Sequence, residues 1–215
     1  MEQQTPMKTR WDKLGPRVVE ALKKRNFAAW YCSSAQEAVE QVFQLIPQTD
    51  VMSWGGSMTV EALGLQAEAR RRGYTLQDRD KAQSPEERRE MMRQALLCDT
   101  FLMSSNAISE NGVLVNLDGT GNRVAAMAYG PKQVIVLAGM NKVVKTEADA
   151  IQRCRTVAAP ANLQRFPGLK TPCQETGACG DCISPDCICN YLLVTRGSAP
   201  AEKIKVILIG EDLGL

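Results

Sequence analysis

The 215-residue chain contains no histidine. This absence excludes every site that needs an imidazole from this chain, including a Ser-His-Asp triad, a Cys-His dyad, a histidine-ligated zinc and a histidine proton shuttle. Acid–base chemistry would therefore fall to Glu, Asp, Lys, Tyr or Cys side chains.

Long hydrophobic runs are also missing. No window approaches 18 uninterrupted apolar residues, the length that a membrane-spanning helix needs. The first residues, MEQQTPMKTRWDKLGP, have neither a continuous apolar core nor a small-residue cleavage site, so they do not read as a secretory signal. We therefore expect a cytoplasmic protein that is not attached to a membrane.

A strong charge of either sign is absent as well. The chain has 26 basic and 24 acidic residues, a net charge of +2, and no basic stripe. Proteins that bind nucleic acids carry clusters of Lys and Arg. Because this chain shows no such cluster, we expect no nucleic-acid partner. Hydrophobic residues make up 44% and charged residues 23% of the chain, which is typical of a globular protein of about one domain.

Strand-like and helix-like segments alternate along the chain. Strands are expected at 27–32, 50–54, 74–76, 99–104, 112–117, 133–138, 191–195 and 205–209, and helices at 16–25, 34–46, 57–65, 84–97, 123–128 and 146–155. This alternation predicts an α/β fold with a largely parallel sheet covered on both faces. The near-continuous apolar run at 133–138 favours a central position in that sheet.

The expected organisation is one α/β domain over 1–170, a Cys-rich loop over 171–190, and the final strands of the same domain over 191–215. A strand from Ile204 to Ile209 at a sheet edge would offer unpaired backbone groups to a second copy. On that ground we expect a possible homodimer.

Eight cysteines are present, and they fall into two classes. Cys32, Cys98 and Cys154 lie in expected strands or helices, where a free cysteine behaves as a small buried hydrophobe. The other five fall within 173–189. In a secreted protein such crowding indicates disulfides, whereas in a reducing cytosol it indicates a metal site.

The spacing of that cysteine run is Cys173-x5-Cys179-x2-Cys182-x4-Cys187-x-Cys189. A C-x2-C pair can grip one metal, and four thiolates suit zinc or an iron–sulfur cluster. We predict Cys173, Cys179, Cys182 and Cys189 as ligands, with Cys187 as the alternative to Cys189. The spacing differs from that of bacterial ferredoxins, so the metal stays open, and reduced thiols or a disulfide are the alternative interpretation.

Ligands of parallel α/β sheets bind at the carboxyl ends of the strands. Donor-rich turns occupy such positions at 55–57, 105–107, 118–123 and 139–142. The Gly55-Gly56 pair followed by Ser57 can cradle a phosphate or carboxylate at a helix N-terminus, or can simply form a tight turn that needs glycine. The two interpretations have equal weight from this motif alone.

The turn at 118–123 does not match a dinucleotide fingerprint, because Val124 stands where the final glycine belongs, and no Gly-Lys-Ser/Thr follows it. We therefore predict no dinucleotide. Arg123 can hold a carboxylate or phosphate through two hydrogen bonds. The alternative is a turn with solvated polar residues.

Lys142 follows the most apolar strand, where it can bind an anion, act as a base if desolvated, or be a solvated strand end. Glu61 and Glu110 are the carboxylates nearest to the glycine-rich turns, and Glu61 is our candidate base. The alternative is that each is a solvated residue of a helix or loop. The predicted ligand-binding residues are Gly55, Gly56, Ser57, Asn106, Gly119, Gly121, Asn122, Arg123, Asn141 and Lys142.

Several motifs occur together in a familiar order. They are WGGSMT at 54–59 with Glu61, FLMSSNAI at 101–108, GTGNRV at 119–124, YGPK at 129–132, GMNK at 139–142 and AAPAN at 158–162. Over most of residues 10–165 the chain resembles the LUD family, named for lactate utilisation, and its Cys-rich tail resembles a subgroup with extra cysteines there.

The resemblance implies a three-layer α/β fold like that of ribose-phosphate isomerase, glucosamine-phosphate deaminase and the CoA transferases. Some members of the family belong to bacterial systems that oxidise L-lactate to pyruvate beside iron–sulfur proteins. The family has no settled catalytic mechanism, so the resemblance implies the location of a pocket rather than a reaction.

Two functions follow as hypotheses. In the first, a LUD-type protein binds a small anion, a hydroxy acid or a phosphorylated metabolite, in lactate utilisation or related carbon metabolism. In the second, the Cys-rich loop carries a metal or iron–sulfur cluster, and the chain is an electron-transfer or assembly subunit with iron–sulfur partner proteins and no catalysis of its own. A purely structural cysteine clip is a third interpretation.

Overall fold

The computed structural model describes residues 5–215. The α-helices are α1 (Pro6–Lys23), α2 (Ala35–Gln44), α3 (Met58–Ala62), α4 (Leu65–Arg71), α5 (Pro85–Gln94), α6 (Asn122–Ala128), α7 (Glu147–Arg153), α8 (Ala159–Leu163) and α9 (Pro172–Thr176). The 3₁₀ turns are η1 (Arg79–Lys81), η2 (Ala95–Leu97) and η3 (Met140–Lys142), and a π-helix, η4 (Cys154–Ala158), joins α7 to α8.

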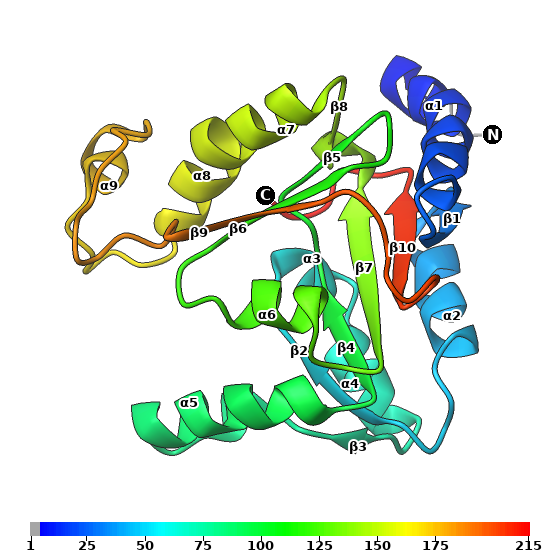
Figure 1. Ribbon diagram of the computed structural model, residues 1–215, viewed down its shortest axis with the longest axis horizontal. Coiled ribbons are helices and arrows are strands. Elements are labelled where there is room, and N and C mark those ends of the chain that lie inside the picture. The colour runs from blue at the N-terminus through cyan, green and yellow to red at the C-terminus, as the bar shows by residue number, and fades with distance from the viewer. Residues whose placement is uncertain (1–4) are drawn as a thin grey trace.

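A six-stranded sheet forms the centre of the molecule (Figure 1). Its order is β1 (Ala28–Cys32), β10 (Ile204–Ile209), β7 (Gln133–Gly139), β4 (Thr100–Met103), β2 (Val51–Trp54) and β3 (Thr75–Leu76), and each pairing is parallel. The apolar strand β7 lies in the middle, between β10 and β4. The predicted α/β fold with a mostly parallel sheet is confirmed.

Both faces of this sheet are covered. Alternate residues of a strand point to opposite faces, and in β7 Val134 and Val136 join the core cluster that contains Val18 of α1. Their neighbours Ile135 and Leu137 join a second cluster, which contains residues of α2, α3 and α4. The sheet is therefore the middle layer of a three-layer arrangement.

A smaller mixed sheet lies over one side of the first (Figure 1). Its order is β8 (Val143–Val144), β5 (Ala107–Ser109), β6 (Leu114–Asp118) and β9 (Tyr191–Thr195), with β6 antiparallel to both neighbours. Residues 107–109 and 143–144 were not expected as strands, because two or three residues are too few to show a period-2 alternation.

The first helix begins ten residues before the expected start at Pro16. The Thr5 hydroxyl accepts a hydrogen bond from the Lys8 amide, and Pro6 occupies the first turn, so the helix starts there. Pro16 therefore lies inside α1 rather than at its N-terminus. The prediction was wrong because a proline was taken as a start signal although a capped start precedes it.

The edge position expected for residues 204–209 is also wrong. Strand β10 pairs with β1 on one side and with β7 on the other, and it is buried. A strand with both neighbours in place offers no unpaired backbone groups to a second copy. The argument that suggested a homodimer is therefore removed.

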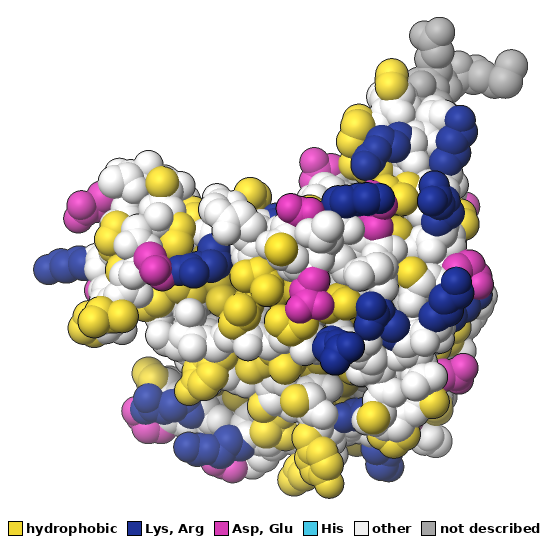
Figure 2. Space-filling model, turned by 45° about the horizontal axis from the view of Figure 1, so that its top comes forward, with side chains coloured by type: hydrophobic (Ala, Val, Ile, Leu, Met, Phe, Trp, Pro, Cys, Tyr) yellow, Lys and Arg dark blue, Asp and Glu magenta, His cyan; other side chains and the backbone are white. Residues whose placement is uncertain are grey.

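The Cys-rich segment, residues 171–190, projects from the body at the left of Figure 1. Apart from the single turn α9 it has no regular structure, and Ile183 within it is 100% exposed. Figure 2 shows hydrophobic side chains, a class that there includes cysteine, gathered where this lobe meets the body. A segment with so little buried apolar surface needs another source of order.

The three cysteines outside the Cys-rich segment lie in the interior of the protein. Cys32, Cys98 and Cys154 are buried, as predicted for small hydrophobes. Within residues 5–215, every helix is too short or too polar to cross a membrane.

Candidate functional site

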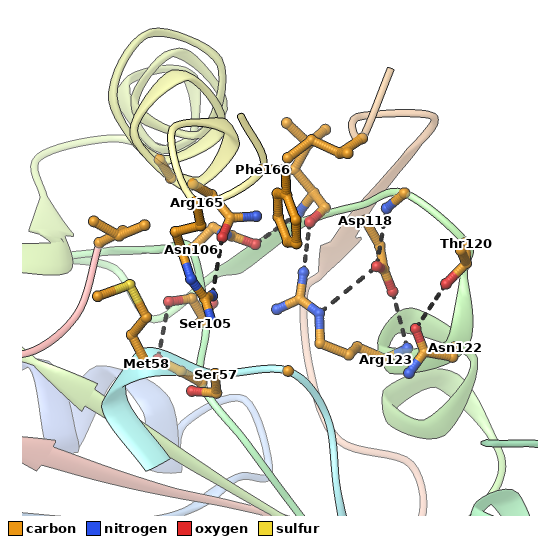
Figure 3. Close-up of a pocket in the computed structure, with 18 of the residues that line it drawn as sticks. Ser57, Met58, Ser105, Asn106, Asp118, Thr120, Asn122, Arg123, Arg165 and Phe166 are labelled. Carbon is orange, nitrogen blue, oxygen red and sulfur yellow. Dashed lines mark hydrogen bonds and ion pairs between the residues drawn. The ribbon is translucent and has the colours of Figure 1, made fainter. Parts of the chain in front are cut away.

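The predicted turns meet at one edge of the central sheet. Strands β2, β4 and β7 are parallel neighbours, so the turns after Trp54, Met103 and Gly139 lie at the same edge. The turn after β6 faces them from the smaller sheet, and a cavity of about 230 Å³ lies between them (Figure 3).

Seven of the ten predicted ligand-binding residues line this cavity. They are Gly56, Ser57, Asn106, Gly119, Asn122, Arg123 and Lys142. Seven further polar residues line it that were not among the ten. They are Arg79, Ser104, Ser105, Asp118, Thr120, Asn162 and Arg165.

The glycine pair after β2 shapes one wall. A Cβ added to Gly55 would lie 2.6 Å from Cγ of Arg123, so the glycine lets the arginine stem pass. Ser57 caps α3, because its hydroxyl oxygen accepts a hydrogen bond from the Val60 amide at 3.2 Å. Gly55 therefore leaves space for Arg123, while Gly56 and Ser57 themselves line the cavity.

Arg123 is held in place by backbone and carboxylate oxygens. Its Nη2 donates to the Leu117 carbonyl oxygen at 2.6 Å, and its Nε lies 3.7 Å from Oδ1 of Asp118. The Asp118 carboxylate also accepts hydrogen bonds from the backbone amides of Gly119, Arg123 and Val124. These contacts hold the Asp118 carboxylate and the Arg123 side chain in fixed positions at the cavity wall (Figure 3).

Lys142 is the least exposed cation of the cavity, with 3% of its surface accessible. Its Nζ donates to the hydroxyl oxygens of Thr59 at 2.9 Å and of Ser104 at 3.0 Å. Burial, followed by the positive charges of Arg153 and Arg123, lowers its pKa to about 7, although Asp212 acts in the opposite direction.

Arg79 lines the cavity as well, and the sequence did not reveal it. It lies in η1, is 9% exposed, and its Nε has no hydrogen-bond partner within the described part of the chain. Burial and the neighbouring Arg88 lower the pKa of this guanidinium. It follows the end of β3, which is parallel to β2, but its segment contains no glycine-rich turn, so the sequence did not single it out.

The opposite wall comes from the end of α8. Arg165 and Phe166 reach toward the cavity from above in Figure 3, and Asn162 of α8 also lines it. The candidate base Glu61 does not line the cavity. Its carboxylate is half exposed and lies 3.8 Å from Nη2 of Arg165, which makes it a partner of that arginine.

The other predicted residues lie outside the cavity lining. Gly121 precedes α6 with a φ of 85° and adjoins the Tyr191 ring. The Asn141 side-chain oxygen accepts a hydrogen bond from the Leu213 amide at 3.3 Å, so it holds the segment after β10 in place.

A second cavity, of about 250 Å³, is lined by the four cysteines predicted as metal ligands. They are Cys173, Cys179, Cys182 and Cys189. Cys187, the alternative ligand, lies with its Sγ 3.0 Å from Sγ of Cys189. All five are free thiols, and no three Cys, Asp or Glu side chains of residues 5–215 are arranged closely enough to hold a metal ion.

The two cavities share a wall. Leu117 lines both of them, and Ile188, between Cys187 and Cys189, lines the first. The Asn190 amide donates to the Gly119 carbonyl oxygen at 3.0 Å, so the Cys-rich segment is attached directly to the turn after β6.

Comparison with known sequences points to one family. The sequence profile of the LUD domain matches residues 15–209. No curated protein matches the chain at a significant level.

Solved structures provide three further comparisons. A DUF162 family protein from Deinococcus radiodurans is similar with a TM-score of 0.53 and 13% identity, over 92% of this chain and 97% of that chain. eIF2B delta from Chaetomium thermophilum gives 0.31 and 17%, over 66% and 55%. 5-Methylthioribose 1-phosphate isomerase from Pyrococcus horikoshii OT3 gives 0.34 and 16%, over 75% and 51%. The first shows a shared fold, whereas the other two scores are too low to support an inference.

Proposed function

The chain belongs to the LUD domain family, and on that premise we propose that it binds a small anionic metabolite in the cavity at the strand ends. The ligand is a hydroxy acid or a phosphorylated compound, and its context is lactate utilisation or related carbon metabolism. The proposal concerns binding, and it assigns no reaction to the protein.

The excess of positive charge around the cavity carries this proposal. Among the described lining residues, four side chains are basic, namely the three guanidiniums of Arg79, Arg123 and Arg165 and the amine of Lys142, and Asp118 is the one acidic side chain. A buried cation without a partner is costly, and an anion between these groups would remove that cost.

Among these residues, Arg79 gives the strongest support for anion binding. Its guanidinium is nine-tenths buried, and its Nε lies 3.9 Å from the nearest carboxylate, Oδ1 of Asp80. Guanidinium groups bind carboxylates and phosphates through paired hydrogen bonds. The cavity volume of about 230 Å³ suits a small ligand, since pockets for drug-sized molecules begin at about 300 Å³.

Thermal unfolding with inorganic phosphate and with L-lactate tests the proposal. We expect at least one of the two to raise the Tm, because a ligand that binds only the folded state stabilises it. Arg79→Met should remove most of that rise. Arg71→Met is the matched control, because Arg71 is exposed on α4 and pairs with Glu68. Unchanged protection of Arg79→Met would assign the anion to another site.

The Cys-rich segment supports a second candidate function. We propose that Cys173, Cys179, Cys182 and Cys189 bind zinc or an iron–sulfur cluster after a small rearrangement, with Cys187 as the alternative ligand. The supporting observation is that four thiols from one irregular segment line one cavity of about 250 Å³. Metal ligation would supply the order that this poorly buried segment otherwise lacks. With a cluster, the chain would act as an electron-transfer or assembly subunit.

Anaerobic purification followed by metal analysis and a visible spectrum tests this candidate. A brown protein would indicate an iron–sulfur cluster, and a colourless protein with bound zinc would indicate a zinc site. The double variant Cys179→Ser/Cys182→Ser should lose the metal, whereas Cys98→Ala, at a buried position far from the segment in sequence, should keep it. A metal-free and colourless wild-type protein would contradict the candidate.

A further inference from the structure

We propose that Lys142 is a nucleophile, whose amine forms an imine with a small carbonyl compound that also carries a carboxylate or phosphate group. This inference rests on the anion-binding function proposed above, and it adds a reactive group and a substrate class to the same cavity.

The hydrogen bonds around Lys142 fit a neutral amine. The Thr59 hydroxyl donates to the Leu213 carbonyl oxygen, and the Ser104 hydroxyl donates to the Ser105 carbonyl oxygen. Both hydroxyl oxygens are therefore acceptors toward Lys142 Nζ, at 2.9 Å and 3.0 Å. A neutral amine has two protons to donate and one lone pair, so the two hydroxyls use its protons and leave the lone pair free.

The surroundings of the amine also favour the neutral form. Lys142 is 3% exposed, and no carboxylate within residues 5–215 forms an ion pair with it. The nearby charges are the cations Arg153 and Arg123, with Asp212 as the acidic neighbour. Desolvation next to other cations is an established way to activate a lysine for attack on a carbonyl.

The rest of the cavity defines the partner of this amine. Arg79 and Arg123 line the same cavity and suit a carboxylate or phosphate group. A ligand whose anionic group is held by these guanidiniums would place a neighbouring carbonyl in the cavity with Lys142. The predicted substrates are therefore 2-oxo acids and phosphorylated aldehydes or ketones.

The reaction balances without a further reagent. The Nζ lone pair attacks the carbonyl carbon, and an N–C bond forms. The C–O bond then breaks, and the oxygen leaves as water with the two protons that the amine gives up, which leaves a C=N bond. Borohydride can trap this product, because it adds hydride to the imine carbon while the nitrogen takes a proton from water.

Borohydride trapping with peptide mass mapping tests the inference. We would incubate the full chain with pyruvate, as a simple 2-oxo acid, or with dihydroxyacetone phosphate, as a phosphorylated ketone, and then reduce it. The expected result is a reduced adduct of one probe on Lys142, which excess inorganic phosphate suppresses. Lys142→Met should give no adduct at this position.

Lys145 provides the matched control. It is exposed, forms an ion pair with Glu110 and lies three residues from Lys142. Lys145→Met should leave the Lys142 adduct unchanged. Mapping on the wild-type chain keeps the test decisive even if Lys142→Met folds poorly.

The outcomes separate this inference from the proposed function. If a probe raises the Tm but no adduct forms on Lys142, the imine is wrong and anion binding stands. If the adducts are spread over exposed lysines and phosphate does not suppress them, the imine is also wrong. If neither the probes nor phosphate nor L-lactate raises the Tm and no adduct forms, both proposals are contradicted.

Discussion

Lys142 carries an ionisable amine, and only 3% of the surface of this residue is accessible to solvent. Its pKa of about 7 lies below the ordinary value of 10.5. Between these two values the unfolded chain holds a proton that the folded chain has released. Stability rises with pH wherever the unfolded state binds more protons, so Lys142 destabilises the fold most below about pH 7 and least above about pH 10.5.

The variant Lys142→Met should therefore gain stability over the wild type near neutral pH. The gain should shrink by up to ~1.4 kcal/mol per pH unit as the pH rises through this window, because one pKa unit corresponds to that free energy. Urea unfolding of both proteins at several pH values, in the presence of a thiol reductant, measures it. A difference that does not change with pH would contradict a buried, weakly basic Lys142.

A second prediction at this scale concerns Gly55, whose missing Cβ makes room for Arg123. Gly55→Ala should displace the Arg123 stem, lower the Tm gain caused by phosphate, and destabilise the fold by about 1–3 kcal/mol, as overpacking does. Gly168→Ala is the control, because a Cβ there meets nothing within 4 Å. Equal phosphate protection of both variants would remove Gly55 from the site.

Residues of the site differ in how far the sequence could place them. Lys142 and Arg123 could be assigned because each lies in a donor-rich turn next to a recognisable strand. Arg79 and Arg165 could not, because they lie in a 3₁₀ turn and beyond a short helix, where no local pattern separates them from solvated arginines. Only the three-dimensional arrangement shows that their side chains share a cavity.

In helix α1, Gly15 is subject to two opposing effects, namely helix propensity and the space available for a side chain. Gly15 lies in the helix interior, where alanine would be favoured by roughly 0.5–1 kcal/mol. A Cβ at this position, however, would lie 2.2 Å from a ring carbon of Tyr31. The steric conflict is the larger effect, because the ring extends from β1 against α1 and its hydroxyl is held there by a hydrogen bond to the Asp12 carboxylate.

We therefore expect Gly15→Ala to destabilise the fold by about 1–3 kcal/mol, despite the better helix propensity of alanine. Lys13→Ala in the same helix is exposed and should change stability little. Urea unfolding of the two variants checks the prediction. A stabilised Gly15→Ala would show that Tyr31 can move away without cost.

The elements of the smaller sheet were harder to predict than those of the central one. Strand β7 has six buried residues in its seven, so its apolar run is visible in the sequence. Strands β5 and β8 have three and two residues, and their pairing depends on contacts with segments far away in the chain. The order of the six central strands likewise follows from packing. For this reason the edge position predicted for residues 204–209 was wrong.

At the scale of the whole molecule, the Cys-rich segment and the anion cavity are physically connected. Ile188 lines the cavity, and the Asn190 side chain binds the Gly119 carbonyl oxygen. A change in the thiols on either side of Ile188 should therefore move this wall. If metal binding changes the affinity for the anion, the anion must change the affinity for the metal by the same factor.

We expect zinc loading to change the Tm gain that phosphate produces, because ligation would reposition Cys189 and with it Ile188. The comparison is between zinc-loaded and chelator-treated protein under a thiol reductant. The double variant Cys179→Ser/Cys182→Ser should show the same phosphate effect under both treatments. Identical phosphate protection of loaded and stripped wild-type protein would contradict the connection.

The proposed anion site requires basic side chains from separate parts of the chain to meet in one cavity. A crystal structure at low ionic strength with tungstate, an anion located by its anomalous scattering, tests this most directly. The predicted result is a tungstate ion in the cavity, in contact with Arg79 and Arg123. Tungstate bound only elsewhere on the protein, with nothing in the cavity, would contradict the account.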